Sequence, residues 1–159
     1  MKLHEATIEA DAEVPVIHIY RDFAGTPSQL IRAHLDPALF SRWVGPHGTE
    51  IRIDYWTAKT GGSWRYVGNL GEAEFAFRGC FHSVGVDRFV QTFTWEGQPD
   101  DVALETFEFT DAGDGVTRMH AWSLCESFEI RDGWLKSGME TGVNDGYDKL
   151  DRMLVDGLS

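Results

Sequence analysis

The sequence is poor in the residues that mark several specialised classes of protein. It has only two cysteines, Cys80 and Cys125, without the spacing of metal ligands, so we expect small buried thiols rather than a disulfide framework or a zinc site. Basic residues are also scarce, with 14 Lys and Arg against 26 Asp and Glu and a formal charge of −12. That charge has the wrong sign for a phosphate backbone or an anionic membrane. We therefore expect neither nucleic-acid nor membrane binding.

Targeting segments and short catalytic motifs are missing as well. There is no apolar run of membrane length and no signal peptide, which together with the few cysteines predicts a reducing, cytoplasmic location. There is no nucleophile elbow, no phosphate-binding glycine loop and no zinc-ligand spacing. We accordingly predict no metal and no cofactor.

Large aromatic rings, in contrast, are plentiful. The 159 residues are 42% hydrophobic and 13% aromatic and include six Trp and ten Phe, enough to fill a core or to line an apolar cavity. The length fits one domain. We expect a loose, acidic arm over residues 1–13 and a single domain over residues 14–159.

The periodicity predicts an α+β fold. A strand over residues 14–23 is followed by two short helices, the first capped by Thr26 and the second ending at Val44. Period-two patterns then predict six consecutive strands, which we expect to pair as an antiparallel meander. They lie near residues 49–56, 63–67, 75–82, 89–95, 104–109 and 116–126. A long helix, capped by Asp132, is predicted from about Gly133 to Val155.

Three glycines fall at successive helical repeats of that long helix, namely Gly138, Gly142 and Gly146. An interior glycine costs about 1 kcal/mol relative to alanine, so this strip requires a reason. Either the helix approaches another surface closely, or the strip leaves space for a ligand. A curved sheet with one long helix must bury the helix on its concave face.

Several motifs are similar to those of one family. They are Asp36 to Pro46, Gly61 to Tyr66, Phe77-Arg78-Gly79 and Gly142 to Leu150. In this order and spacing they resemble the activator-of-heat-shock-protein-90-ATPase homologue family of the SRPBCC or START-like superfamily. The resemblance implies the helix-grip fold, a seven-stranded antiparallel sheet wrapped around the C-terminal helix with an apolar cavity between them.

The chain departs from that family where volume and polarity matter. Family members commonly carry Trp where this chain has Val44 and Val143, and often His where it has Ser123. Smaller groups therefore gather near the expected cavity.

The candidate site is the wall of this cavity. The predicted lining residues are Trp43, Trp64, Tyr66, Phe77, Phe81, Phe93, Trp95, Met139, Gly142 and Val143. The predicted polar contacts are His47, His82 and Ser123. Core packing is the alternative interpretation for each aromatic ring.

Three functions remain open at this point. The first is binding of a small apolar or aromatic molecule in the cavity. The second is a cyclase- or hydrolase-like enzyme that uses the same cavity, with its catalytic residues unassigned. The third, suggested by the family, is a chaperone-linked interaction module, and the habit of the family also suggests a homodimer.

Overall fold

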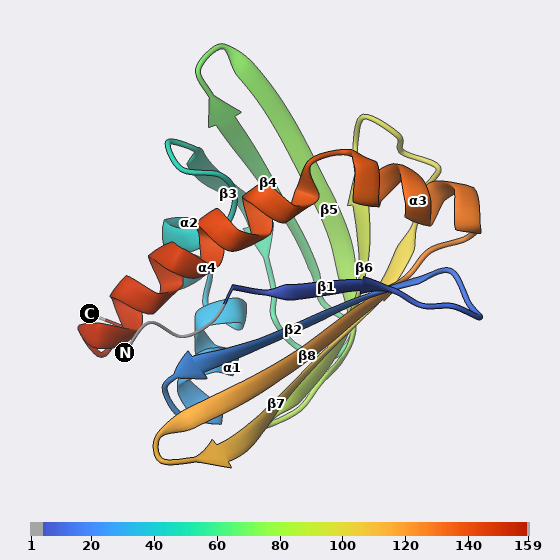
Figure 1. The fold of residues 1–159 in the computed structure, drawn as a ribbon. Coiled ribbons are helices and arrows are strands. Elements are labelled where there is room, and N and C mark those ends of the chain that lie inside the picture. Colours follow the sequence, from blue (N-terminus) through green and yellow to red (C-terminus); the bar gives the residue numbers. More distant parts are fainter. Residues whose placement is uncertain (1–4, 159) are drawn as a thin grey trace.

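The computed structural model describes residues 5–158, in which eight strands curve around four helices (Figure 1). The elements in chain order are β1 (Thr7–Ala10), β2 (Val16–Ala24), α1 (Pro27–Leu35), α2 (Pro37–Trp43), β3 (Glu50–Trp56), β4 (Ser63–Leu70), β5 (Ala73–Val84), β6 (Arg88–Trp95), β7 (Ala103–Gly113), β8 (Val116–Leu124), α3 (Phe128–Lys136) and α4 (Met139–Val155). The α+β class and the order of strand, two short helices, meander and C-terminal helix are as predicted.

The strands form one antiparallel sheet in the order β1-β2-β8-β7-β6-β5-β4-β3. The expected count of seven strands is wrong, because Thr7–Ala10 form an additional edge strand that pairs with β2 from Thr7 opposite Tyr20 to Ala10 opposite Ile17. This strand lies within the segment 1–13 that we expected to be a loose arm. Residues 1–4 of that segment lie outside the described residues.

The first short helix begins at its predicted cap, and the second begins directly after Asp36. The Thr26 hydroxyl accepts the backbone N–H of Gln29, and the Gln29 side chain accepts the N–H of Thr26. Asp36 ends α1 and caps α2 by accepting the N–H of Ala38. Each cap satisfies a donor that the first helical turn leaves free. The chain therefore turns sharply between α1 and α2, and both helices reach the concave face.

The C-terminal helical segment is two helices rather than one. α3 is capped by Ser127, not by Asp132, and begins earlier than predicted. Gly138 then interrupts the segment, because its backbone adopts a left-handed φ of 85° and forms the N-cap of α4. Glycine tolerates that conformation at little cost. Of the three glycines of the strip, only Gly142 and Gly146 therefore lie inside α4.

A buried ion pair and aromatic contacts hold α4 on the concave face. Arg21 of β2 is 4% exposed and donates to both carboxylate oxygens of Asp151, at 2.8 and 2.7 Å. Tyr147 packs edge-on against Phe23, and its hydroxyl lies 3.5 Å from the sulfur of Met119. The sheet thus grips the C-terminal helix, as the helix-grip fold requires.

Gly142 and Gly146, the two glycines inside α4, have different neighbours. A Cβ atom at Gly146 would lie 3.0 Å from the carbonyl oxygen of Trp43, whereas one at Gly142 would lie 3.6 Å from the ring of Pro46. Glycine at 146 therefore allows α4 to pack closely against α2. At 142 the neighbouring ring is at ordinary van der Waals distance.

Candidate functional site

The concave face has a closed half and an open half. In the closed half, the side chains beneath α1, α2 and the C-terminal part of α4 are buried, and they include Phe23, Leu30, Trp43, Met119 and Leu150. The open half lies toward α3 and the start of α4, and its side chains are only half-buried. Its members are Gln91, Phe93, Glu105, Phe107, Ser123, Trp134, Met139 and Val143. The centre of the sheet is therefore less completely covered on this side.

A row of three polar side chains crosses the open half. Strand register places Gln91 of β6 opposite Glu105 of β7, and Glu105 opposite Ser123 of β8. The Gln91 amide donates to Oε1 of Glu105 at 3.0 Å, and the Ser123 hydroxyl donates to Oε2 at 2.7 Å. A carboxyl group with two neutral donors therefore stands in an otherwise apolar surface.

The environment of Glu105 disfavours its charge. Burial raises the pKa of its carboxyl group, while the hydrogen bonds from Ser123 and Gln91 act in the opposite direction. None of the ion pairs formed by residues 5–158 includes Glu105. A carboxyl group whose pKa is shifted by its surroundings is a feature that often marks functional sites.

The sheet borders two hollows, one on each face. One of about 10 Å³ lies between α3 and the sheet and is bordered by Phe93, Cys125 and Trp134; it has room for about one water molecule. Trp134 lies over Phe93 with 6.1 Å between the ring centroids, so a larger occupant must displace the Trp134 side chain. The second, of about 160 Å³, lies on the convex face. Its lining combines hydroxyl, thiol and charged groups, such as those of Arg78 and Cys80, with the apolar atoms of Tyr55 and Val102, and it is open to solvent.

The family follows from comparison of the chain with known proteins. Residues 24–155 match the family model described as activator of Hsp90 ATPase homolog 1-like protein. The chain belongs to this family. No curated protein matches it.

Solved structures share the fold of this Hsp90-ATPase-activator-like chain. Protein Ms6760 from Mycobacterium smegmatis superposes with a TM-score of 0.84 at 19% identity, covering 96% of this chain and 97% of that one. A Rhodobacter sphaeroides protein gives 0.83 at 24% identity over 94% and 98% of the two chains. An Arthrobacter aurescens protein gives 0.84 at 21% identity over 94% and 91%. At these identities the likeness concerns the fold.

Four of the aromatic residues predicted to line the site belong to the core of this family member. Trp43, Trp64, Tyr66 and Phe81 are each at most 6% exposed. Trp43 donates its indole N–H to the carbonyl of Ala33 at 3.0 Å, whereas the indole N–H of Trp64 is buried without a partner among the described residues. Whether any of these rings contacts a ligand remains a prediction.

The other predicted lining residues are more accessible. Phe77 and Phe93 are half-buried, with ring centroids 5.1 Å apart. Trp95 is 37% exposed and borders the small pocket beneath α3. The helical residues Met139, Gly142 and Val143 are half-buried on the first turns of α4. Phe93, Met139 and Val143 thus belong to the open half.

The three predicted polar contacts lie far apart. His47 is exposed after α2, where its backbone N–H donates to the Asp145 carboxylate at 3.0 Å. His82 is an exposed residue of β5, next to the buried Phe81. Only Ser123 lies in the open half.

Glu105 and Gln91, the other members of the polar row, are absent from the predicted site. A signal for Glu105 is present in the sequence, because it alternates in phase with Phe107 and Phe109 on the face that β7 turns to the core. Gln91 lies in the same phase as Phe89 and Phe93 of β6. A polar residue in phase with core aromatics indicates an inward-facing polar group.

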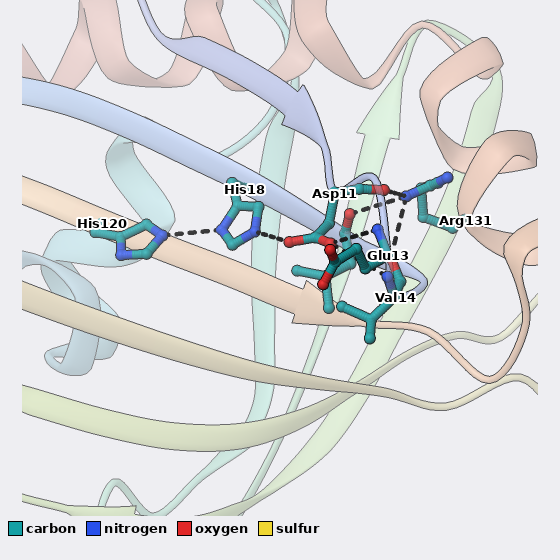
Figure 2. A network of polar contacts seen from close by, with 7 residues as sticks. Asp11, Glu13, Val14, His18, His120 and Arg131 are labelled. Carbon is teal, nitrogen blue, oxygen red and sulfur yellow. Dashed lines mark hydrogen bonds and ion pairs between the residues drawn. The ribbon is translucent and has the colours of Figure 1, made fainter.

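A second polar network lies on the convex face (Figure 2). Asp11 Oδ2 lies 2.9 Å from Nε2 of His18, and Nδ1 of His18 lies 3.0 Å from Nε2 of His120. Burial, followed by the nearby His18, lowers the pKa of His120. Arg131 of α3 donates to the carbonyl oxygens of Asp11, Val14 and Val16. The network therefore joins the β1–β2 turn to β8 and to α3.

Two kinds of feature are absent from residues 5–158. In this part of the chain no group of three His, Cys, Asp or Glu side chains is placed to hold a metal ion. No helix in the same range is both long and apolar enough to cross a membrane.

Proposed function

We propose that this protein binds a small apolar or aromatic molecule in the open half of the concave face, between the sheet and the α3–α4 segment. The Gln91–Glu105–Ser123 row is the observation that carries the proposal, because it places a polar group with free hydrogen-bonding capacity among half-buried rings. Apolar walls with a few placed polar groups are typical of small-molecule sites. Membership of a START-like family supports the same function.

Entry of the ligand requires displacement of Trp134. This side chain is half-buried over Phe93, and it precedes the left-handed Gly138 that separates α3 from α4. Rotation of the Trp134 side chain at this end of α3 uncovers Phe93 and keeps the hydrogen bonds that Arg131 donates from α3 to the β1–β2 turn. The ion pair and the closed half then keep the rest of the fold fixed.

The proposal is tested with Nile red, a neutral apolar dye whose fluorescence increases in apolar surroundings. Val143→Trp places a large ring in the open half, whereas Val155→Trp makes the same change on the same helix at a side chain that is 84% exposed. We expect Val143→Trp to weaken dye binding at least tenfold and Val155→Trp to leave it unchanged. Equal binding by both variants and the wild type, with unchanged melting temperatures, would contradict the proposal.

An enzyme of the cyclase or hydrolase type is the second candidate. The raised pKa of Glu105 favours it, since burial that shifts the pKa of a carboxyl group upward makes that group a better proton donor. Material that co-purifies with the protein decides between the two functions. NMR spectra of this material before and after incubation with the protein will be identical for a binder and different for an enzyme.

A further inference from the structure

Glu105 presents hydrogen-bonding capacity that the fold leaves unused. A carboxylate can accept about four hydrogen bonds, and each oxygen of Glu105 receives a single neutral one, from Gln91 or from Ser123. Both neighbours are donors, which is the arrangement that stabilises an ionised carboxylate rather than a neutral acid. What the site lacks is a positive charge.

No cationic side chain of the described residues 5–158 supplies it. The titratable groups that the charge of Glu105 affects are Tyr66 of β4, Tyr147 of α4 and Cys125 after β8. His34 of α1 packs against Phe107 on the same face, and Arg21 of β2 and Arg131 of α3 are the buried arginines of the described residues. Burial raises the pKa of the two tyrosines and of the thiol and lowers that of His34 to about 4, so all four are neutral at pH 7.

Both arginines are committed elsewhere. Arg21 forms a bidentate ion pair with the carboxylate of Asp151. Arg131 donates to Asp132 at 2.8 Å and to the backbone carbonyls of the β1–β2 turn. The charge of Glu105 is therefore uncompensated by its surroundings.

The walls of the open half suit an organic cation. Phe93, Phe107 and Trp134 present half-buried rings on the same side of the sheet as Glu105, and the faces of such rings attract cations. The net charge of −12 also raises the concentration of small cations around the protein. A neutral ligand would use the rings but would leave the carboxylate without a partner.

We propose that the ligand of the open half is an amphiphilic amine, an apolar or aromatic body carrying a protonated nitrogen, and that Glu105 is its counter-ion. This inference rests on the proposed function of the open half. The nitrogen donates to the carboxylate between the Gln91 and Ser123 bonds, while the apolar body lies against Phe93 and beneath Trp134.

Two probes of the same size separate the charge from the apolar body. 2-Naphthylmethylamine is a cation at neutral pH, and 2-naphthalenemethanol is its neutral counterpart. We expect the wild-type protein to bind the amine at least tenfold more tightly than the alcohol at pH 7.5. A charge-assisted hydrogen bond to Glu105 is strong enough to give this difference in affinity. The preference should decrease as the pH falls through the raised pKa of Glu105, because the protonated acid no longer attracts the cation.

Two glutamine variants on one strand complete the test. Glu105→Gln keeps the shape and removes the charge, so the tenfold preference should disappear. Glu108 lies on the other face of β7, where its Oε2 atom is 3.4 Å from Nε of Arg88. In Glu108→Gln the tenfold preference for the amine should therefore remain. Melting temperatures establish that both variants are folded.

The possible outcomes separate the inference from the function on which it rests. Equal affinities for amine and alcohol, or an alcohol that binds more tightly as the pH falls, would overturn the amine while leaving the open half as a binding site. If the preference persists in Glu105→Gln, the assignment of Glu105 is wrong. Failure of both probes and of Nile red to bind the wild-type protein would reject the site as well as the amine.

Discussion

Alanine at the two glycines inside α4 should have opposite effects on stability, although both changes add one methyl group to the same helix. At Gly142 the new Cβ would lie 3.6 Å from the ring of Pro46, which is an ordinary contact. Alanine is favoured over glycine in a helix by up to about 1 kcal/mol. Because position 142 lies near the start of α4, we expect Gly142→Ala to raise the free energy of unfolding by about 0.5 kcal/mol.

At Gly146 the same gain in helix propensity is opposed by overpacking. The new Cβ would lie 3.0 Å from the carbonyl oxygen and 3.5 Å from the Cε3 atom of Trp43. Neither group moves easily, because the Trp43 ring is buried and its indole N–H is bound to the carbonyl of Ala33. Overpacking of this kind costs about 1–3 kcal/mol, so after the helix gain we expect Gly146→Ala to lose about 1 kcal/mol.

Urea unfolding of the two variants and the wild type measures the difference. We expect about 1.5 kcal/mol between Gly142→Ala and Gly146→Ala, with the same dependence of the free energy on urea in all three proteins. If Gly146→Ala is as stable as Gly142→Ala, α2 and α4 are not in tight contact at this position. The physical explanation of the glycine strip would then be wrong.

Three further predictions concern charges inside the fold. Asp151→Asn leaves the buried Arg21 without its main counter-ion and should lower the free energy of unfolding in urea by about 3 kcal/mol. A decrease below ~1 kcal/mol would contradict a stabilising role of this ion pair. The wild type should lose about 3 kcal/mol of stability between pH 6.5 and 4, because the unfolded chain takes up a proton that the buried imidazole of His34, with its pKa lowered to about 4, does not. His34→Phe should abolish this loss. An unchanged dependence of stability on pH would argue against a neutral His34. Glu105→Gln should gain stability relative to the wild type as the pH rises above 4.5. The raised pKa of Glu105 makes the folded wild type bind more protons than the unfolded chain in this range, so the wild type loses stability there. A difference in stability that stays constant with pH would refute this.

The parts of the fold that local signals specify were predictable. Thr26 marked the start of the first short helix, and the alternation of large and polar residues marked the meander. β1 was missed because its four residues are mostly exposed and carry little alternation, so that only pairing with β2 reveals the strand. Gly138 follows Lys136 as a helix-ending glycine commonly does, but it was interpreted as the first glycine of a strip inside one long helix.

The candidate site was predictable only in outline. The phase of Glu105 with Phe107 places it on the inner face from sequence alone. Its contacts with Gln91 and Ser123, however, depend on the register of β6, β7 and β8, which the turns between them set and no local pattern shows. The division of the concave face into a closed and an open half depends on where four helices pack, and this is a property of the tertiary structure.

The central claim is that the open half of the concave face binds a small molecule through Glu105. An NMR titration of the isotope-labelled protein with 2-naphthylmethylamine tests it most directly. We expect the largest changes in backbone amide shifts to cluster at Gln91, Glu105 and Ser123 on the three neighbouring strands. Shifts that cluster instead at Tyr55 and Cys80 around the convex hollow, or no shifts at millimolar amine, would contradict it.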